Sequence, residues 1–241
     1  MSIRRYTHIF FDLDNTLWDF KANSFDALHL TFLYFNIGEQ CGDYQMFFDV
    51  FTKYNDILWS EYRNKKLSKK ELKRLRFQNT FEELNIPGID PLETDEFYLN
   101  EIPKQKKLVR GTIELLDHLR HKGYLMYIIT NGFREVQHKK LQNSGLSEYF
   151  SRVYISEEIK APKPNTEIFE YAVKSSNARK RNSLMVGDDW DSDIAGALNF
   201  GIDAVYYCPS SDCSVNAIAG NTTSRNNVYA VGTLSDLIQI L

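Results

Sequence analysis

The chain has 241 residues, of which 43% are hydrophobic and 25% are charged, as in an ordinary soluble globular protein. This length suits one large domain or a domain with a sizeable insert. The formal net charge of −3 excludes a global positive field that would recruit nucleic acid or a membrane surface.

The first predicted strand, Thr7–Asp12, leads into a pair of acids. The stretch FFDLDNTLWDF, Phe10–Phe20, carries Asp12 and Asp14 two positions apart. If the strand continued through both acids, their carboxylates would share one face of the sheet and repel each other. The pair is therefore a candidate functional site whose charge needs a compensating partner.

More than 100 residues with little strand character separate this strand from the next one. Apolar spacing and a possible Ser68/Glu71 capping box predict helices in this region. We therefore predict a helical insert over residues 20–108. Its expected elements are helices over Asn23–Asn36, Asp43–Asn64 and Ser68–Leu84, a turn over Ile86–Pro91, and a short helix over Asp95–Ile102.

After the insert, nearly all-apolar runs alternate with helical patterns. Such runs predict strands buried on both faces, and the alternation predicts an open, parallel α/β sheet. The expected strands are Tyr124–Thr130, Ser151–Ser156, Ser183–Asp188, Asp203–Cys208 and, last, about Val228–Val231. The expected helices are Thr112–Lys122, Arg134–Ser144, Asn165–Ser175 and Ile194–Phe200.

Polar groups lie just past the carboxyl ends of four predicted strands, the edge at which open α/β sheets bind ligands. Several carboxylates without His or Cys favour Mg²⁺, whose charge would offset their repulsion. A lysine and a threonine hydroxyl opposite them would hold an anion, most naturally a phosphate. One carboxylate could attack phosphorus and form an aspartyl phosphate, and a second could act as general acid and base. These groups are Asp12 with Asp14, Thr130-Asn131-Gly132, Lys163 and Asp188.

Four motifs resemble those of the haloacid dehalogenase-like superfamily of phosphatases, in the same order. DLDNT (Asp12–Thr16) matches its D-x-D-x-T motif, and the other three matches are ITNG (Ile129–Gly132), KPNTEIF (Lys163–Phe169) and VGDDWDSDIAGALNFG (Val186–Gly201). The first motif alone is a moderate signal, but four in order over nearly the whole chain are a strong one. The resemblance implies a Rossmann-like core over residues 1–19 and 109–241, with a helical cap domain over 20–108 that closes over the site.

The resemblance implies a role for each carboxylate. Asp12 would be the nucleophile and a Mg²⁺ ligand. Asp14 would be the general acid and base and would also bind Mg²⁺ through its backbone carbonyl. Asp188 would bind Mg²⁺ directly or through water, with Asp189 as the main alternative. Asp193 would orient the catalytic lysine or a metal-bound water.

The resemblance also implies a phosphate site. Thr130 would hydrogen-bond the transferring phosphoryl group, helped by backbone N–H groups at Asn131 and Gly132. Lys163 would neutralise the developing charge. Lys160 is a nearby rival, but the family pattern of Lys-Pro before a helix selects Lys163.

Two helix-capping interpretations are open beside these roles. Thr130 could cap the helix entered at Phe133, which is compatible with phosphate binding because helix N-termini bind anions. Asp191 is expected to cap the helix that begins near Ser192.

Within the superfamily the chain looks most like the pyrimidine 5′-nucleotidases, although related sugar-phosphate phosphatases share much of the same pattern. The stretches that carry this likeness are Leu58–Ser68, Ile129–Phe150 and Ile155–Ala172. We therefore expect a Mg²⁺-dependent phosphatase acting on a small phosphorylated metabolite, a nucleotide or a sugar phosphate. Four aromatic residues could stack on a base, although core packing is commoner at such positions: Trp18, Phe20, Trp59 and Tyr62.

Three other functions fit the sequence less well. A haloacid dehalogenase would not need Asp14. A phospho-Asp receiver module, which signals without turnover, has no such insert and no acid two residues after its nucleophile. Nucleic-acid binding through the basic stretch Tyr62–Phe77 is less favoured than a solvated helix face.

The expected location is the cytoplasm. No apolar run approaches the roughly 20 residues of a membrane span, and the apolar run Ile9–Phe11 is too short for a signal core. The three cysteines Cys41, Cys208 and Cys213 fit neither a disulfide framework nor a zinc site, which favours a reducing compartment.

Overall fold

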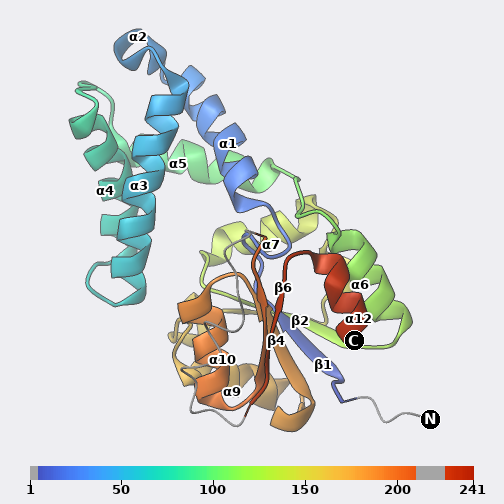
Figure 1. Ribbon diagram of the computed structural model, residues 1–241. Coiled ribbons are helices and arrows are strands. Elements are labelled where there is room, and N and C mark those ends of the chain that lie inside the picture. The colour runs from blue at the N-terminus through green and yellow to red at the C-terminus, as the bar shows by residue number, and fades with distance from the viewer. Residues whose placement is uncertain (1–4, 210–225) are drawn as a thin grey trace. The chain divides into compact units, whose positions relative to one another are not determined.

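The chain divides into two compact units in the computed structural model, which describes residues 5–209 and 226–241 (Figure 1). The first unit comprises Met1–Phe20, Lys107–Arg134 and Ser144–Leu241. The second comprises Lys21–Lys106 together with Glu135–Asn143.

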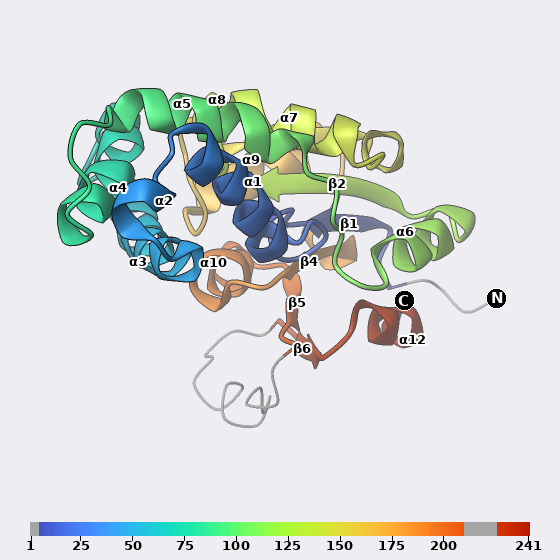
Figure 2. The same ribbon diagram turned by 90° about the horizontal axis from the view of Figure 1, so that it is seen from above.

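The first unit is built on a six-stranded sheet in the order β3-β2-β1-β4-β5-β6, with every neighbouring pair parallel. Figure 2 shows β4, β5 and β6 following one another toward one edge. The predicted parallel α/β sheet is therefore confirmed. Its strands are β1 (His8–Phe11), β2 (Leu125–Thr130), β3 (Arg152–Ile155), β4 (Ser183–Gly187), β5 (Asp203–Tyr207) and β6 (Val228–Val231).

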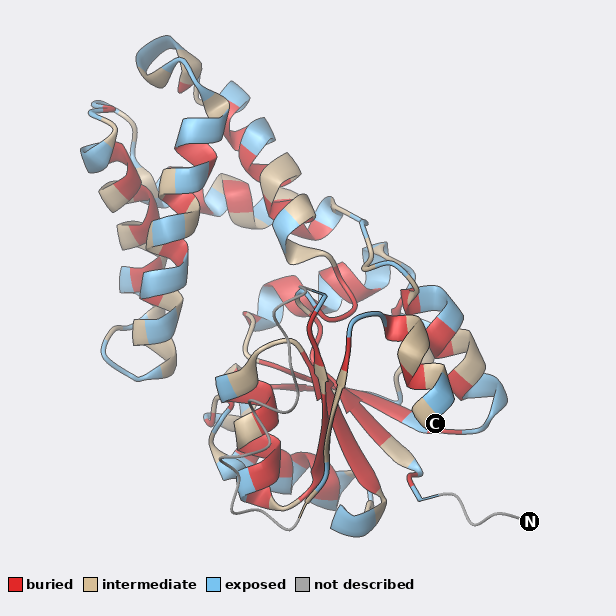
Figure 3. Ribbon diagram, viewed as in Figure 1, coloured by how far each residue is buried: buried red, intermediate tan, exposed pale blue. Residues whose placement is uncertain are grey.

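The central strands are buried on both faces, as Figure 3 shows. Alternate residues such as Phe10 and Met185 pack with helices α9 (Thr166–Ser175) and α10 (Ala195–Phe200) in one hydrophobic cluster. Helices α6 (Thr112–His121) and α12 (Leu237–Ile240) lie on the opposite side of the sheet (Figure 1). Burial on both faces explains why the sequences of these strands are continuous apolar runs and do not alternate between apolar and polar residues.

The direction of strand addition reverses beside β1. The chain first adds β2 and β3 on one side of β1 and then places β4 on the other side. Such a switch point leaves a crevice at the carboxyl ends of the strands. Asp12 directly follows β1, Thr130 ends β2, and Asp188 directly follows β4, so all three meet at this edge.

The second unit is helical. The Ser68/Glu71 capping box at the start of α4 is confirmed. Helix α5 begins at Pro91, four residues before the predicted start at Asp95, because Asp90 accepts hydrogen bonds from the Leu92 and Glu93 N–H groups. The elements are α1 (Phe20–Tyr34), α2 (Gly38–Cys41), α3 (Tyr44–Arg63), α4 (Lys69–Glu83), α5 (Pro91–Glu101), η1 (Ile102–Lys104) and most of α7 (Arg134–Asn143).

An ion pair is buried in the aromatic core of this unit. Arg76 Nε lies 2.6 Å from Asp95 Oδ1, and Arg76 Nη1 donates to Asn55 Oδ1 at 3.2 Å. The guanidinium also lies against the rings of Phe51 and Tyr98, with its carbon 5.8 and 5.0 Å from their centroids. A buried charge is costly unless it is paired with an opposite charge. Because Arg76 lies on α4 and Asp95 on α5, this pairing fixes how the two helices pack against each other.

No helix in the described part of the chain is both long enough and apolar enough to cross a bilayer. Cys41 is a free thiol, but Cys208 is disulfide-bonded. One disulfide is not the framework that the sequence argued against, but it does not fit the reducing compartment that the cysteine content favoured. Cys213 lies outside the described residues.

Candidate active site

The chain leaves the sheet directly after β1 and turns sharply. The Asp12 N–H still donates to Val186 O at 2.9 Å, but Asn15 has a φ of 60° and its N–H donates to Trp18 O at 2.8 Å. Asn tolerates this left-handed conformation better than most residues. The strand thus ends at the first acid, and Asp12 and Asp14 do not occupy successive positions on one strand face.

Lys163 joins this strand end to two other parts of the unit. It is 2% exposed, and its ammonium group pairs with Asp12 and lies 2.7 Å from Asp193 Oδ1. The same nitrogen donates to Ile129 O, 2.8 Å away, on β2. Lys160, the rival in the sequence, is exposed at the end of α8 (Ser156–Ile159). The structure thus brings Lys163, and not Lys160, to the first acid.

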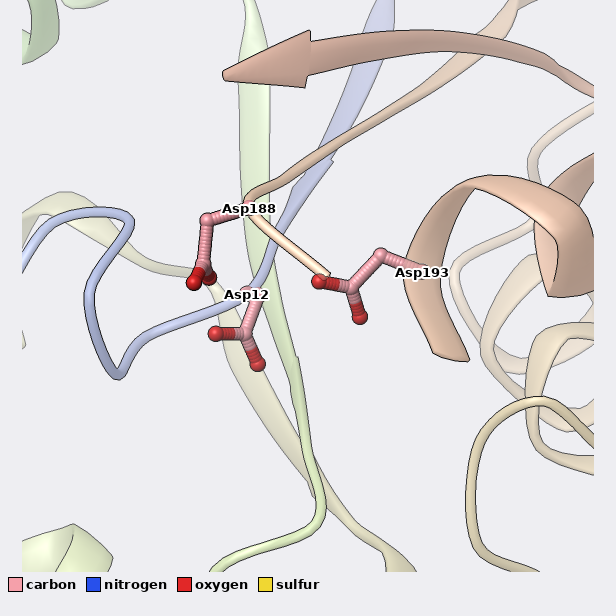
Figure 4. Close-up of side chains that lie close together, drawn as sticks. All are labelled: Asp12, Asp188 and Asp193. Atoms are coloured by element: carbon pink, nitrogen blue, oxygen red, sulfur yellow. The ribbon is translucent and has the colours of Figure 1, made fainter. Parts of the chain in front are cut away.

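Three carboxyl groups converge at the switch point. One oxygen from each of Asp12, Asp188 and Asp193 lies within 4.8 Å of the others, and Figure 4 shows the three groups turned toward one another. All donors are carboxylate oxygens, which are hard ligands of the kind that Mg²⁺ takes. Asp193 already binds Lys163 with Oδ1 and accepts the Asp189 N–H with Oδ2 at 3.2 Å. Asp12 and Asp188 are therefore the better-placed metal ligands.

The cluster carries more negative charge than its single lysine neutralises. Burial raises the pKa of Asp12 well above its usual range, Lys163 opposes this shift, and Asp193, Asp188 and Asp14 add to it. Burial, with the nearby Asp193, raises the pKa of Asp188 to about 7. Burial alone would lower the pKa of Lys163, but Asp12 and Asp193 raise it above its usual value. A cation with oxygen ligands fits this excess of buried carboxylates.

The loop after β4 positions two of these acids. Asp189 accepts the Ser192 N–H at 3.0 Å and begins the π-helix η4 (Trp190–Ile194). The prediction that Asp191 caps this helix is therefore wrong, because the helix begins two residues earlier than the sequence indicated. A Cβ added at Gly187 would lie 2.2 Å from Asp193 Oδ2, so this strand end requires glycine.

The segment after β2 forms the third side of the site. Thr130 is 1% exposed, and its Oγ1 accepts the Gly132 N–H at 3.1 Å. Helix α7 begins at Arg134, whose N–H donates to Glu157 Oε2 at 3.0 Å. Thr130 therefore closes the short turn before the helix, whereas Glu157 receives an N–H of the helix's first turn.

Two contacts in the site have no clear signal in the sequence. Thr16 Oγ1 donates to Asp188 Oδ1 at 2.9 Å and so ties the first motif to the last. The Asn131 side chain makes two hydrogen bonds to the main chain of Lys163. Both contacts depend on where distant loops meet, which local sequence patterns do not encode.

The candidate stacking residues differ in exposure. Trp18 is fully buried, which is inconsistent with stacking on a substrate base. Trp59 and Tyr62 are half-buried and pack edge-to-face, with ring centroids 5.6 Å apart.

The sequence profile of the haloacid dehalogenase-like hydrolases matches residues 6–201 of the chain. The chain belongs to this hydrolase family. The matched range includes every candidate site residue, from Asp12 to Asp193, and ends at the last residue of the fourth motif.

Three named proteins are similar to this chain over most of its length. The pyrimidine 5′-nucleotidase PynA of Streptococcus pneumoniae is 33% identical over 98% of this chain and 95% of its own length. The pyrimidine 5′-nucleotidase YjjG of Escherichia coli is 35% identical, covering 82% of this chain and 84% of its own length. The structure of the hydrolase YfnB of Bacillus subtilis bound to magnesium superposes with a TM-score of 0.85 at 26% identity, covering 98% of this chain and 99% of YfnB.

Proposed function

We propose that this phosphatase of the haloacid dehalogenase-like family hydrolyses nucleoside 5′-monophosphates, with pyrimidine nucleotides as its preferred substrates. The observation that carries the chemistry is the buried pairing of Asp12 with Lys163 at the end of β1, beside Asp188. Similarity to two pyrimidine 5′-nucleotidases over most of the chain supports the substrate class.

The chemistry proceeds in two displacements. A carboxylate oxygen of Asp12 attacks phosphorus, and the bond from phosphorus to the ester oxygen breaks as Asp14 gives that oxygen a proton. Water then attacks phosphorus and loses a proton to Asp14, and the carboxylate of Asp12 leaves. Inorganic phosphate and the free alcohol are the products, and both acids return to their initial state.

The remaining groups stabilise and hold the phosphoryl group. Lys163 carries the positive charge next to the attacking oxygen, and Thr130 with the backbone N–H groups of Asn131 and Gly132 would hydrogen-bond the phosphoryl oxygens. Asp193 keeps the ammonium group of Lys163 in place through their 2.7 Å contact. Lys163 thus stabilises negative charge and does not transfer a proton.

A Mg²⁺ ion fits the site. Asp12 and Asp188 would hold it with their carboxylates and Asp14 with its backbone carbonyl, and Thr16 orients Asp188 by occupying Oδ1. When bound, the ion would neutralise negative charge on the carboxylates and on the phosphoryl oxygens. The similar hydrolase YfnB has a structure bound to magnesium, which supports Mg²⁺ as the ion.

A sugar phosphate is the alternative substrate class, because the groups assigned here bind only the phosphoryl moiety that all these substrates share.

A substrate panel tests the proposal. We expect p-nitrophenyl phosphate to be hydrolysed with Mg²⁺ and not with EDTA, and Asp12→Asn to abolish turnover. Among metabolites, kcat/KM should be highest for pyrimidine 5′-monophosphates. A value about tenfold higher for a hexose phosphate would refute the nucleotidase assignment. Undiminished turnover by Asp12→Asn would refute the phosphatase mechanism itself.

A further inference from the structure

Lys163 is a buried residue on a segment that has no regular structure. It lies between α8, which ends at Ile159, and α9, which begins at Thr166. A residue there has no helix or strand partners for its main-chain N–H and C=O, although buried main-chain groups need hydrogen bonds. The position of this lysine must therefore be fixed by a group from elsewhere in the unit.

The side chain of Asn131 satisfies both main-chain groups of Lys163. The Lys163 N–H donates to Asn131 Oδ1 at 2.8 Å, and Asn131 Nδ2 donates to Lys163 O at 3.0 Å. The two hydrogen bonds close a ring, as do the two main-chain hydrogen bonds that a directly opposed pair of residues exchanges in an antiparallel sheet. A primary amide can make this ring because it carries one acceptor and donors in a single plane, whereas a carboxylate offers acceptors alone.

Both the main chain and the ammonium group of Lys163 are consequently hydrogen-bonded to residues at the end of β2. Asn131 holds its main chain, and Ile129 O accepts from its ammonium group at 2.8 Å. These attachments set the direction in which the side chain reaches Asp12.

We propose that Asn131 is a positioning residue for phosphoryl transfer, which fixes Lys163 beside Asp12. The inference rests on the proposed phosphatase function. Its side chain acts through the lysine, and the contribution of Asn131 to phosphate binding comes from its backbone N–H. Because Lys163 stabilises charge that develops during the reaction, loss of this anchor should lower kcat more than it raises KM.

Steady-state kinetics with p-nitrophenyl phosphate and Mg²⁺ tests this inference. For Asn131→Ala we expect kcat to fall by roughly 10- to 100-fold, the scale of a misplaced catalytic group, with KM changing less than about threefold. Asn131→Asp keeps the shape but loses the donor, and it should show the same pattern. The control is Asn182→Ala, whose amide likewise donates to a main-chain oxygen, that of Arg5 at 2.9 Å, away from the site; its kcat should match the wild type.

A double variant separates positioning from a general structural effect. If Asn131 acts through Lys163, Asn131→Ala should cost nothing further in a Lys163→Ala background. Losses that multiply in the double variant, or a kcat within twofold of wild type for both Asn131 variants, would overturn the inference. If the wild type itself shows no turnover, the proposed function fails instead. A crystal structure of Asn131→Asp then still decides the positioning claim, which requires Lys163 to be displaced from Asp12.

Discussion

Lys163 Nζ lies 2.7 Å from Asp193 Oδ1, and both side chains are almost completely buried. Asp193 faces the lysine from the π-helix η4, whereas Asp12 faces it from the end of β1. The lysine is therefore held between two carboxylates, and only one of them is assigned to attack the substrate.

Replacing Asp193 with Asn should impair activity and stability together. The variant keeps the side-chain shape but replaces the charge-assisted contact with the Lys163 ammonium group by a neutral one, which we expect to cost about 1 kcal/mol of unfolding free energy and to lower kcat. Chemical denaturation and steady-state kinetics measure the two effects. Asp191→Asn makes the same chemical change at an exposed position in the same π-helix and should stay within about 0.5 kcal/mol of wild type. Equal effects of the two substitutions would contradict the assigned role of Asp193.

Replacing Gly187 with Ala should displace the Asp193 side chain without adding or removing a charged group. The new Cβ would lie 2.2 Å from Asp193 Oδ2, so the carboxylate must move away from its place beside Lys163. We expect a loss of about 1–3 kcal/mol in unfolding free energy and a reduced kcat. Gly232→Ala is the matched control, because no atom lies within 4 Å of its added Cβ. A Gly187→Ala enzyme with wild-type kcat would show that the position of Asp193 does not matter for catalysis.

The contribution of Asp188 to the stability of the metal-free protein should fall as pH rises toward neutrality. Burial raises the pKa of Asp188 to about 7, above its unfolded value of about 4. The folded state therefore binds this proton more tightly, so the stabilisation is complete below pH about 4 and is lost as pH rises through about 7. Thermal unfolding in EDTA across this range measures the effect.

Added Mg²⁺ should reverse this dependence, because the ion competes with the proton for the same carboxylates. Mg²⁺ affinity, measured by calorimetry, should therefore weaken as pH falls below about 7. In Asp188→Asn, affinity should be low at every pH. A Mg²⁺ affinity that does not change between pH 5 and pH 8 would contradict the assignment of Asp188.

The buried pair in the helical unit gives a prediction independent of catalysis. Asp95→Ala leaves Arg76 as an uncompensated buried charge, which should cost about 3–5 kcal/mol of unfolding free energy. Replacing Arg76 with Met and Asp95 with Leu in the same protein should recover most of this loss. Denaturant unfolding checks both variants. Lys73→Met is the control, since Lys73 Nζ lies 3.8 Å from Asp95 Oδ2 and is 28% exposed, and should cost less than about 1 kcal/mol. If the double replacement cost as much as Asp95→Ala, the pair would be contributing more than charge compensation.

The sheet was predictable from the sequence because its strands are short apolar runs buried on both faces. The last strand agrees with the prediction at both ends, Val228 and Val231. The start of α5 was not predictable in the same way, because Pro91 is equally compatible with a turn and with the first turn of a helix. The side chain of Asp90 decides between the two.

Asp12 and Asp188 were predictable because each directly follows a strand end, where a polar residue is conspicuous after an apolar run. Asp193 lies within η4, and only the family motif indicated it. The contacts that hold the site together were not predictable. The bonds from Thr16 to Asp188 and from Asn131 to Lys163 join residues 172 and 32 positions apart. Their geometry depends on the paths of irregular loops, for which the sequence has no periodic pattern.

The covalent step on Asp12 is most directly tested in Asp14→Asn with p-nitrophenyl phosphate. The p-nitrophenolate group leaves without a proton, so Asp12 should still be phosphorylated, but no base remains to activate water. Rapid-quench mass spectrometry should therefore find a phosphoryl group on the peptide that contains Asp12, at close to one per active site. A protein that releases p-nitrophenolate without ever carrying phosphate on Asp12 would contradict the mechanism.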